Sequence, residues 1–141
     1  MIRKTGSANW KGGLKDGTGT ISTESGALKA VNYGFNKRFE GEPGSNPEEL
    51  IGAAHASCFS MALSKILGEA GFTADDISTA ATVSLEKSGD GFAVTKSHLE
   101  VTAKVPGASE EDFAKAAKTA KENCPISQLL NAEITMDALL G

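Results

Sequence analysis

The chain has 141 residues, of which 40% are hydrophobic and 23% charged, and 14 basic against 18 acidic side chains give a net charge of −4. This length suits one domain, so we expect residues 1–141 to form a single domain around one core. The negative net charge and the dispersed Lys and Arg residues argue against a nucleic-acid partner.

The composition also bears on the cellular compartment. No apolar run approaches the roughly 20 residues needed to cross a bilayer, so we expect no membrane span. The first residues lack the apolar stretch of a secretory signal, which predicts a cytoplasmic protein. Because the cytoplasm keeps thiols reduced, Cys58 and Cys124 are expected to be free, reactive or transiently paired rather than a structural disulfide.

The first predicted elements are strands. Residues 1–30 are rich in Gly, Thr and Ser with short strand-like pieces between turn signals, which predicts a peripheral β-hairpin. In the following segment four apolar residues share one parity, the period-two pattern of a further strand: Val31, Tyr33, Phe35 and Phe39. Arg38 has the other parity, so we expect it to point away from the aromatic face of that strand.

A long helix should follow. Asn46 is a suitable N-cap, Pro47 suits the first helical position, and Glu49 three residues after Asn46 is typical of a capping box. No helix breaker occurs before Gly71, and the middle of the segment, IGAAHASCFSMAL, is apolar or small on every side. We therefore expect a helix that is buried all round. A single chain has little to wrap such a helix with, so we infer a homodimer.

The remaining segments complete the fold. Alternating apolar residues on both sides of a turn at 88–91 predict a β-hairpin with a bulge over 81–105. Ser109 with Asp112 should cap a second helix, which Pro125 interrupts before a short helical turn and a last strand over 134–138. The order of strands, helix, strands, helix and strand predicts an α+β fold.

Two cysteines are the first candidates for chemistry. Cys58 lies in the predicted buried helix, where a free cysteine usually just packs. Cys124 directly precedes Pro125 at a helix start, where unpaired N–H groups favour a thiolate, although a poor N-cap that happens to be cysteine explains it equally well. Together they could cycle through a disulfide, if one sulfur is first oxidised to a sulfenic acid and the other condenses with it.

Other side chains could assist a thiol. A buried thiolate needs a cationic neighbour, and Arg38 is a candidate because a guanidinium keeps its charge and can hold a thiolate and a carboxylate together. A solvated surface arginine is the simpler reading, and spacing alone does not decide. His55 shares a helix face with Cys58 and could act as a base, or it could be a hydrogen-bonded core residue. Zinc would consume both cysteines, His55 and His98 without a recognised ligand spacing, so we expect no metal.

Three separated segments occur in an order that resembles the OsmC/Ohr family, and most closely its osmotically inducible OsmC branch. They are FNKRFEG at 35–41, SNPEELIGAAHASCF at 45–59 and NCPIS at 123–127. The resemblance covers essentially the whole chain. It implies an intertwined α+β homodimer with a long central helix from each chain flanked by antiparallel sheets, and thiol-dependent reduction of organic hydroperoxides.

The resemblance also implies residue roles. Cys58 matches the peroxidatic cysteine, Cys124 the resolving cysteine, Arg38 the thiolate-stabilising arginine and Glu48 the carboxylate that orients it. Glu49, adjacent to Glu48, and His55 are secondary candidates. This assignment reverses the order that position alone favours, in which Cys124 is the reactive thiol. The resemblance calls for no flavin, haem or metal cofactor and points to an external, lipoyl-type dithiol as reductant.

Helix geometry suggests where Glu48 acts. Along a straight helix Glu48 and Cys58, ten residues apart, lie about 15 Å from each other, so they cannot meet within one chain. The residues between them are almost all small, as a close helix crossing requires. If two helices cross antiparallel near Ala53, Glu48 and with it Arg38 would reach the cysteines of the partner subunit.

Two other classes of function stay open from the sequence. One is a dimeric binding module for small apolar molecules, in which Cys58 merely lines the site. The other is a hydroperoxide sensor that signals through its disulfide to a protein partner.

Overall fold

The computed structural model describes all 141 residues. By its internal contacts the chain divides into two parts, Met1–Leu50 and Ile51–Gly141, and each is described by itself. The long helix α2, Pro47–Glu69, begins in the first part and continues into the second. The single domain over 1–141 stays a prediction.

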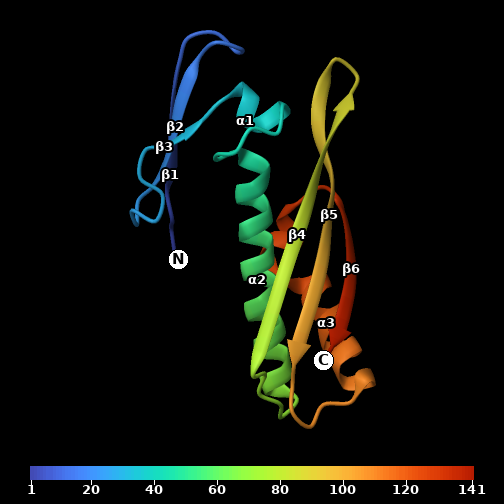
Figure 1. Cartoon of the computed structure of the whole chain (residues 1–141). Coiled ribbons are helices and arrows are strands. Elements are labelled where there is room, and N and C mark those ends of the chain that lie inside the picture. Colours follow the sequence, from blue (N-terminus) through green and yellow to red (C-terminus); the bar gives the residue numbers. More distant parts are fainter. The chain divides into compact units, whose positions relative to one another are not determined.

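The first part contains a small antiparallel sheet. Its strands β1 (Gly6–Lys11), β2 (Thr18–Thr23) and β3 (Val31–Tyr33) pair in the order β1-β2-β3 (Figure 1). The expected hairpin in residues 1–30 is confirmed, with β3 as a third strand. Gly19 lies under two tilted rings, Trp10 and Tyr33, whose centroids are 5.4 Å apart. A Cβ on Gly19 would lie 2.5 Å from atoms of both rings, so a glycine is needed there.

The strand expected over residues 31–39 is wrong beyond Tyr33. Phe35–Phe39 form a short helix, α1, after an extended Gly34. Phe35 and Phe39 are four residues apart, a spacing that fits a helical turn as well as one face of a strand. Their ring centroids are 5.0 Å apart. Arg38 also differs from expectation, since its guanidinium carbon lies 5.2 Å from the centroid of the Phe39 ring.

The helix α2 starts where the sequence predicts. The backbone N–H of Glu49 donates to Oδ1 of Asn46 at 2.8 Å, which confirms Asn46 as N-cap. The expectation of burial on every side is wrong for the single chain, because only one stripe of α2 is buried: Gly52, His55, Phe59, Leu63 and Leu67. The opposite face is exposed, and Met61 on it is 77% exposed.

The expectation that no run could span a bilayer is also wrong, because α2, with 23 residues, is long and apolar enough by length and composition alone. Core helices of folded proteins can meet the same criterion. The buried stripe of α2 packs in the core of the second part. Gly52 belongs to this packing, since a Cβ on it would lie 2.9 Å from the backbone oxygen of Ala81 in β4.

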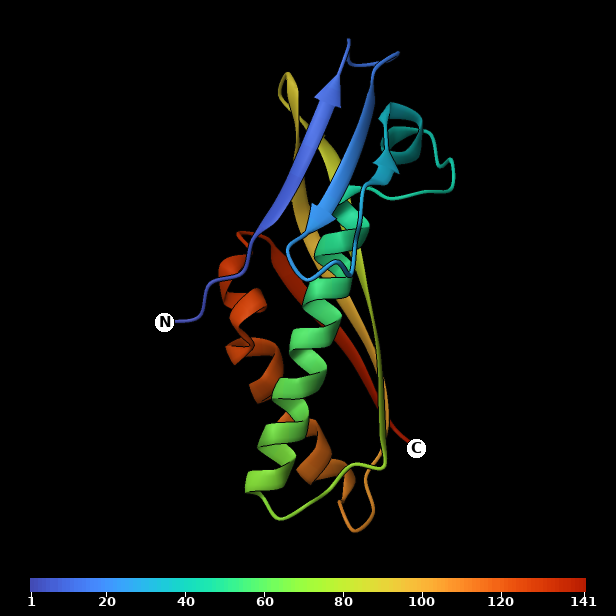
Figure 2. The ribbon, with the colours of Figure 1, turned by 90° about the vertical axis from the view of Figure 1, so that its left-hand side faces the viewer.

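The second part is a sheet with helices on one face (Figures 1 and 2). β4 (Asp76–Ser88) and β5 (Gly91–Lys104) form the predicted hairpin, with a register shift at Ser84/Leu85 that confirms the bulge. α3 (Glu110–Asn123) and the one-turn α4 (Pro125–Leu129) connect β5 to β6 (Glu133–Leu140), which pairs parallel to β5.

The capping box of α3 is confirmed, and the core lies between helices and sheet: Phe59, Leu63, Leu67, Leu99, Val101, Phe113 and Ala117. The elements confirm the α+β class.

Candidate active site

The second part of the chain brings its two cysteines together. Cys58 projects from α2, and Cys124 lies at the junction of α3 and α4. Their thiols are hydrogen-bonded to each other, and the Cys58 sulfur also has a hydrogen bond with the backbone of Ile126. Both cysteines are reduced. A thiol pair in contact needs only a small movement to become a disulfide.

The two thiols differ in exposure. Cys58 is half-buried, whereas Cys124 is fully buried in the core. A reagent from solvent can therefore reach Cys58 more easily than Cys124. Position in the sequence alone favoured Cys124, at a helix start, as the reactive thiol, whereas in the structure Cys124 lies in the core at the start of the one-turn helix α4.

Local structure explains the position of Cys124. Its N–H closes the last turn of α3 by donating to the Ala120 oxygen at 2.9 Å, while its own oxygen accepts from Gln128 at 3.1 Å in the first turn of α4. Its ψ of 130° breaks the helix between the two. The residue before a proline avoids the helical region, so Pro125 fixes this break and turns Cys124 inward.

Electrostatics act on Cys58 in opposing directions. Burial raises the pKa of the Cys58 thiol, and the hydrogen bond and charge interaction with Cys124 raise it further, whereas the hydrogen bond from Ile126 lowers it. The thiolate is the reactive form of a cysteine. Because the neighbouring groups in this part of the chain raise the pKa of Cys58 overall, the thiol requires a nearby positive charge to ionise near neutral pH.

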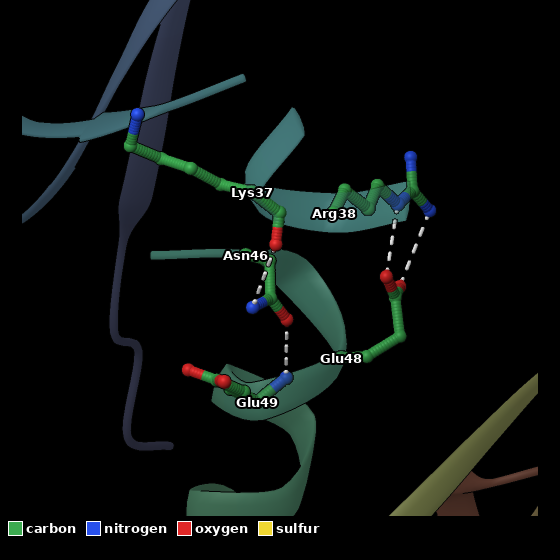
Figure 3. Close-up of polar contacts among 5 residues, drawn as sticks. All are labelled: Lys37, Arg38, Asn46, Glu48 and Glu49. Carbon is green, nitrogen blue, oxygen red and sulfur yellow. Dashed lines mark hydrogen bonds and ion pairs between the residues drawn. The ribbon is translucent and has the colours of Figure 1, made fainter. Parts of the chain in front are cut away.

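Arg38 and Glu48 form a second pair, in the first part of the chain. Arg38 Nε donates to Glu48 Oε1 at 2.9 Å and Nη2 donates to Oε2 at 3.2 Å, a two-point contact between α1 and the start of α2 (Figure 3). The Glu48 side chain is 13% exposed and that of Arg38 is 37% exposed. Such a fork fixes the plane of the guanidinium and leaves other N–H groups for a second anion.

The secondary candidates are placed differently from one another. The Glu49 side chain points away from Arg38, and its backbone N–H belongs to the helix cap (Figure 3). His55 is fully buried, and its two ring nitrogens lie 2.7 Å from Ser97 Oγ and 2.8 Å from Ser127 Oγ. Burial lowers the pKa of His55. With both nitrogens engaged by hydroxyls, the ring has none left to accept a proton from Cys58.

His98, the other histidine, follows Ser97 on β5 and has other partners, with Nδ1 2.6 Å from Thr135 Oγ1 and Nε2 3.1 Å from Asp137 Oδ2. Sequence reasoning assigned no role to three residues that contact Cys58 or His55: Ile126, Ser97 and Ser127. Ile126 interacts with Cys58 through its backbone, and the type of residue at a position does not predict such a contact. The available signal for Ser127 was its place in the segment NCPIS at 123–127, two residues after Pro125.

A mixed α+β fold with two contacting, reduced cysteines defines a thiol-based redox protein. The family profile described as OsmC-like protein matches residues 39–138. The chain is 59% identical over 136 residues to peroxiredoxin OsmC of Escherichia coli (strain K12), which covers 96% of this chain and 95% of that protein. The chain therefore belongs to the OsmC family.

More distant relatives agree with this membership. The organic hydroperoxide resistance protein OhrB of Bacillus subtilis (strain 168) is 26% identical over 117 residues, which cover 82% of this chain and 84% of OhrB. The crystal structure of Bacillus subtilis OhrB superposes with a TM-score of 0.68 at 25% identity, covering 97% of this chain and 98% of OhrB.

An OsmC-like protein from Vibrio cholerae gives a TM-score of 0.77 at 21% identity over 99% of this chain and all of that one, which shows a shared fold.

Proposed function

We propose that the chain is a thiol peroxidase that reduces organic hydroperoxides to alcohols. The observation that carries the proposal is the contact between the half-buried Cys58 thiol and the buried Cys124 thiol. This is the arrangement that a cycle between dithiol and disulfide requires. It agrees with relatives named for peroxiredoxin activity and organic hydroperoxide resistance.

The reaction divides into three steps. The Cys58 thiolate attacks the distal oxygen of the hydroperoxide, the O–O bond breaks, and the alkoxide takes up a proton and leaves as the alcohol. Cys58 is then a sulfenic acid. The Cys124 sulfur attacks it, water leaves, and the Cys58–Cys124 disulfide forms. An external dithiol, of lipoyl type by the resemblance, reduces the disulfide and is itself oxidised.

Exposure supports the order of the two cysteines. A hydroperoxide must reach the sulfur that it oxidises, and Cys58 is the more exposed of the pair. Cys124 needs only to reach the Cys58 sulfur, and the two are already in contact. The roles of peroxidatic and resolving cysteine therefore suit Cys58 and Cys124 in that order.

Arg38 is proposed to supply the positive charge that favours the Cys58 thiolate, with Glu48 holding its plane. Because Glu48 and Cys58 are ten residues apart on α2, helix geometry separates them by about 15 Å. The proposed active site is accordingly composite, with Arg38 and Glu48 donated by one protomer to the cysteines of the other. The exposed small residues of α2, Ala53, Ala54 and Ser57, suit the close crossing of two such helices in a homodimer.

An apolar hollow beside Arg38 supports the choice of substrate. It has a volume of about 270 Å³ and is lined by aromatic and aliphatic side chains with the Arg38 guanidinium among them: Trp10, Leu14, Tyr33, Phe35 and Phe39. Each methylene group that enters such a hollow contributes about 0.8 kcal/mol, so a few are enough for a tenfold preference over hydrogen peroxide.

The reaction is proposed to take place in the cytoplasm, where reducing dithiols are regenerated.

The decisive test is peroxide consumption with a small dithiol, comparing an alkyl hydroperoxide with hydrogen peroxide. We expect the alkyl hydroperoxide to be consumed at least about tenfold faster, and Cys58→Ser to abolish both reactions. Equal rates for the two peroxides would refute the substrate class. A single oxidation without turnover would favour a hydroperoxide sensor, and tight apolar ligand binding unaffected by Cys58→Ser, without peroxide consumption, would favour a binding module.

A further inference from the structure

His55 connects three elements around the thiol pair. Its wholly buried ring lies between Ser97 Oγ on β5, 2.7 Å from Nδ1, and Ser127 Oγ on α4, 2.8 Å from Nε2. Both serines are buried as well. A neutral imidazole has one donor and one acceptor nitrogen, and a hydroxyl can take either role, so both contacts are satisfied together.

The helix α4 depends on such tertiary contacts. It has five residues, and a single helical turn is not stable by itself. Ser127 is its one buried residue, while Leu129 is 73% exposed. The hydrogen bond between His55 and Ser127 therefore attaches α4 to the core, together with the packing of the partly buried Ile126.

The same turn of α2 holds α4 at a second point. Cys58 follows His55 by three residues, and its sulfur is hydrogen-bonded to the Cys124 thiol and to the backbone of Ile126. This second attachment depends on the reacting sulfur, so oxidation of Cys58 removes the thiol–thiol hydrogen bond. The bond between His55 and Ser127 involves no sulfur and can persist through the redox cycle.

We propose that His55 and Ser127 are positioning residues, whose hydrogen bond keeps α4 on α2 so that Cys124 stays within reach of Cys58 after Cys58 has been oxidised. The inference rests on the proposed function and deepens it, because it names the residues that hold Cys124 in place for the resolving step. His55 touches neither peroxide nor sulfur in this role.

The resolving step can be measured without peroxide by using the aromatic disulfide dithiobis-nitrobenzoate. The Cys58 thiolate attacks the reagent, forms a mixed disulfide and releases one thionitrobenzoate. The Cys124 thiolate then attacks the Cys58 sulfur, forms the Cys58–Cys124 disulfide and expels the second thionitrobenzoate. Because Cys124 is fully buried, the second release should be intramolecular, with a rate independent of reagent concentration.

Ser127→Ala should slow the second release about tenfold, the effect of one hydrogen bond, while the first release changes less than about threefold. Ser97→Ala is the matched control, because it also leaves one buried His55 nitrogen without a hydroxyl but keeps α4 attached. Its second release should stay within about threefold of the wild-type rate. Ser127→Thr retains the hydroxyl and should restore most of the rate.

A second pair of variants guards against a folding defect. The amide of His55→Gln can reach the position of Nε2 and bind Ser127, whereas that of His55→Asn can reach only the position of Nδ1 and bind Ser97. We expect a slow second release in His55→Asn and a faster one in His55→Gln. Equal slowing in both serine variants, or a wild-type rate in Ser127→Ala, would overturn the inference.

The outcome separates the inference from the proposed function. A wild-type protein that consumes no alkyl hydroperoxide, yet shows the expected difference between Ser127→Ala and Ser97→Ala, would refute the peroxidase and leave the support of Cys124 by His55 in place. If the wild-type protein consumes alkyl hydroperoxide but Ser127→Ala and Ser97→Ala release the second thionitrobenzoate at the same rate, the peroxidase would stand and the support of Cys124 by His55 would be refuted.

Discussion

Arg38 holds Glu48 at two points, with Nε 2.9 Å from Oε1 and Nη2 3.2 Å from Oε2. A lysine would keep the charge but lose the fork, so we predict that Arg38→Lys lowers kcat/KM for an alkyl hydroperoxide by roughly 10- to 100-fold. Glu48→Gln should lower it in the same direction, because the amide no longer orients the guanidinium by charge. Steady-state kinetics with a small dithiol measures both.

The control for these variants is the exposed ion pair between Lys37 and Glu42, with Nζ 3.3 Å from Oε1. Glu42→Gln removes a carboxylate of the same kind nearby, and exposed ion pairs contribute little. Its kcat/KM should stay within about twofold of wild type. A loss as large as that of Glu48→Gln would mean that general charge in this region, rather than the Arg38 fork, matters.

The two cysteines should fail in different ways. Cys58→Ser should consume no peroxide, whereas Cys124→Ser should undergo one oxidation and then stall at the sulfenic acid or a higher oxidation state on Cys58. Mass spectrometry after one equivalent of alkyl hydroperoxide distinguishes these products. Turnover in Cys58→Ser, with a sulfenic acid on Cys124, would reverse the assignment.

Mixed dimers test the composite site. Cys58→Ser and Glu48→Ala chains should each be inactive as homodimers. If Glu48 serves the cysteines of the partner subunit, a heterodimer of the two contains one site with both Cys58 and Glu48 intact and regains about half of the wild-type activity. Differently tagged chains allow purification of the heterodimer. If the heterodimer has no activity, the carboxylate and the thiol must act within the same chain.

Stability should depend on pH through His55. Burial lowers its pKa in the folded protein, whereas in the unfolded chain the value is about 6.5. Below about pH 6.5 the unfolded state therefore binds more protons, so the free energy of unfolding should fall as pH decreases, by at most about 1.4 kcal/mol per pH unit from this residue. Urea unfolding at about pH 7.5 and about pH 5.5 measures the change.

His55→Gln isolates this contribution, because it removes the titrating group while carboxylates titrate as before. The variant should lose less stability than wild type between the two pH values, although it is less stable at neutral pH. Parallel losses in the two proteins would show that His55 binds a proton equally well in both states.

Local signals in the sequence predicted much of the fold. Asn46 and Ser109 cap their helices because a side-chain oxygen three residues from a free N–H is a local arrangement. The bulged hairpin also follows from neighbouring residues. The wrong prediction of a strand over 31–39 came from Phe35 and Phe39, because a spacing of four residues fits a strand and a helix equally well. Only the packing of the two rings against each other distinguishes the two structures.

Predictions that depended on distant contacts were less secure. From the sequence, Gly52 and its small neighbours were explained by a close crossing of two helices. In the structure, the lack of a side chain at Gly52 instead makes room for the backbone oxygen of Ala81. The position of His55, three residues before Cys58 in the sequence, gave no sign that its ring contacts two serines. Burial of Cys124 depended on how one turn of helix packs, which its neighbours in sequence do not specify.

The path of the chain between the two thiols affects the protein as a whole. The segment from Cys58 to Cys124 contains the end of α2, both strands of the β4–β5 hairpin and all of α3. A disulfide between its ends would close nearly half of the chain into a ring, and a ring of that length removes about 4 kcal/mol of conformational entropy from the unfolded state. The oxidised protein should therefore melt at a higher temperature than the reduced one, so that calorimetry alone could report the redox state and each reduction would return the enzyme to its more easily unfolded form.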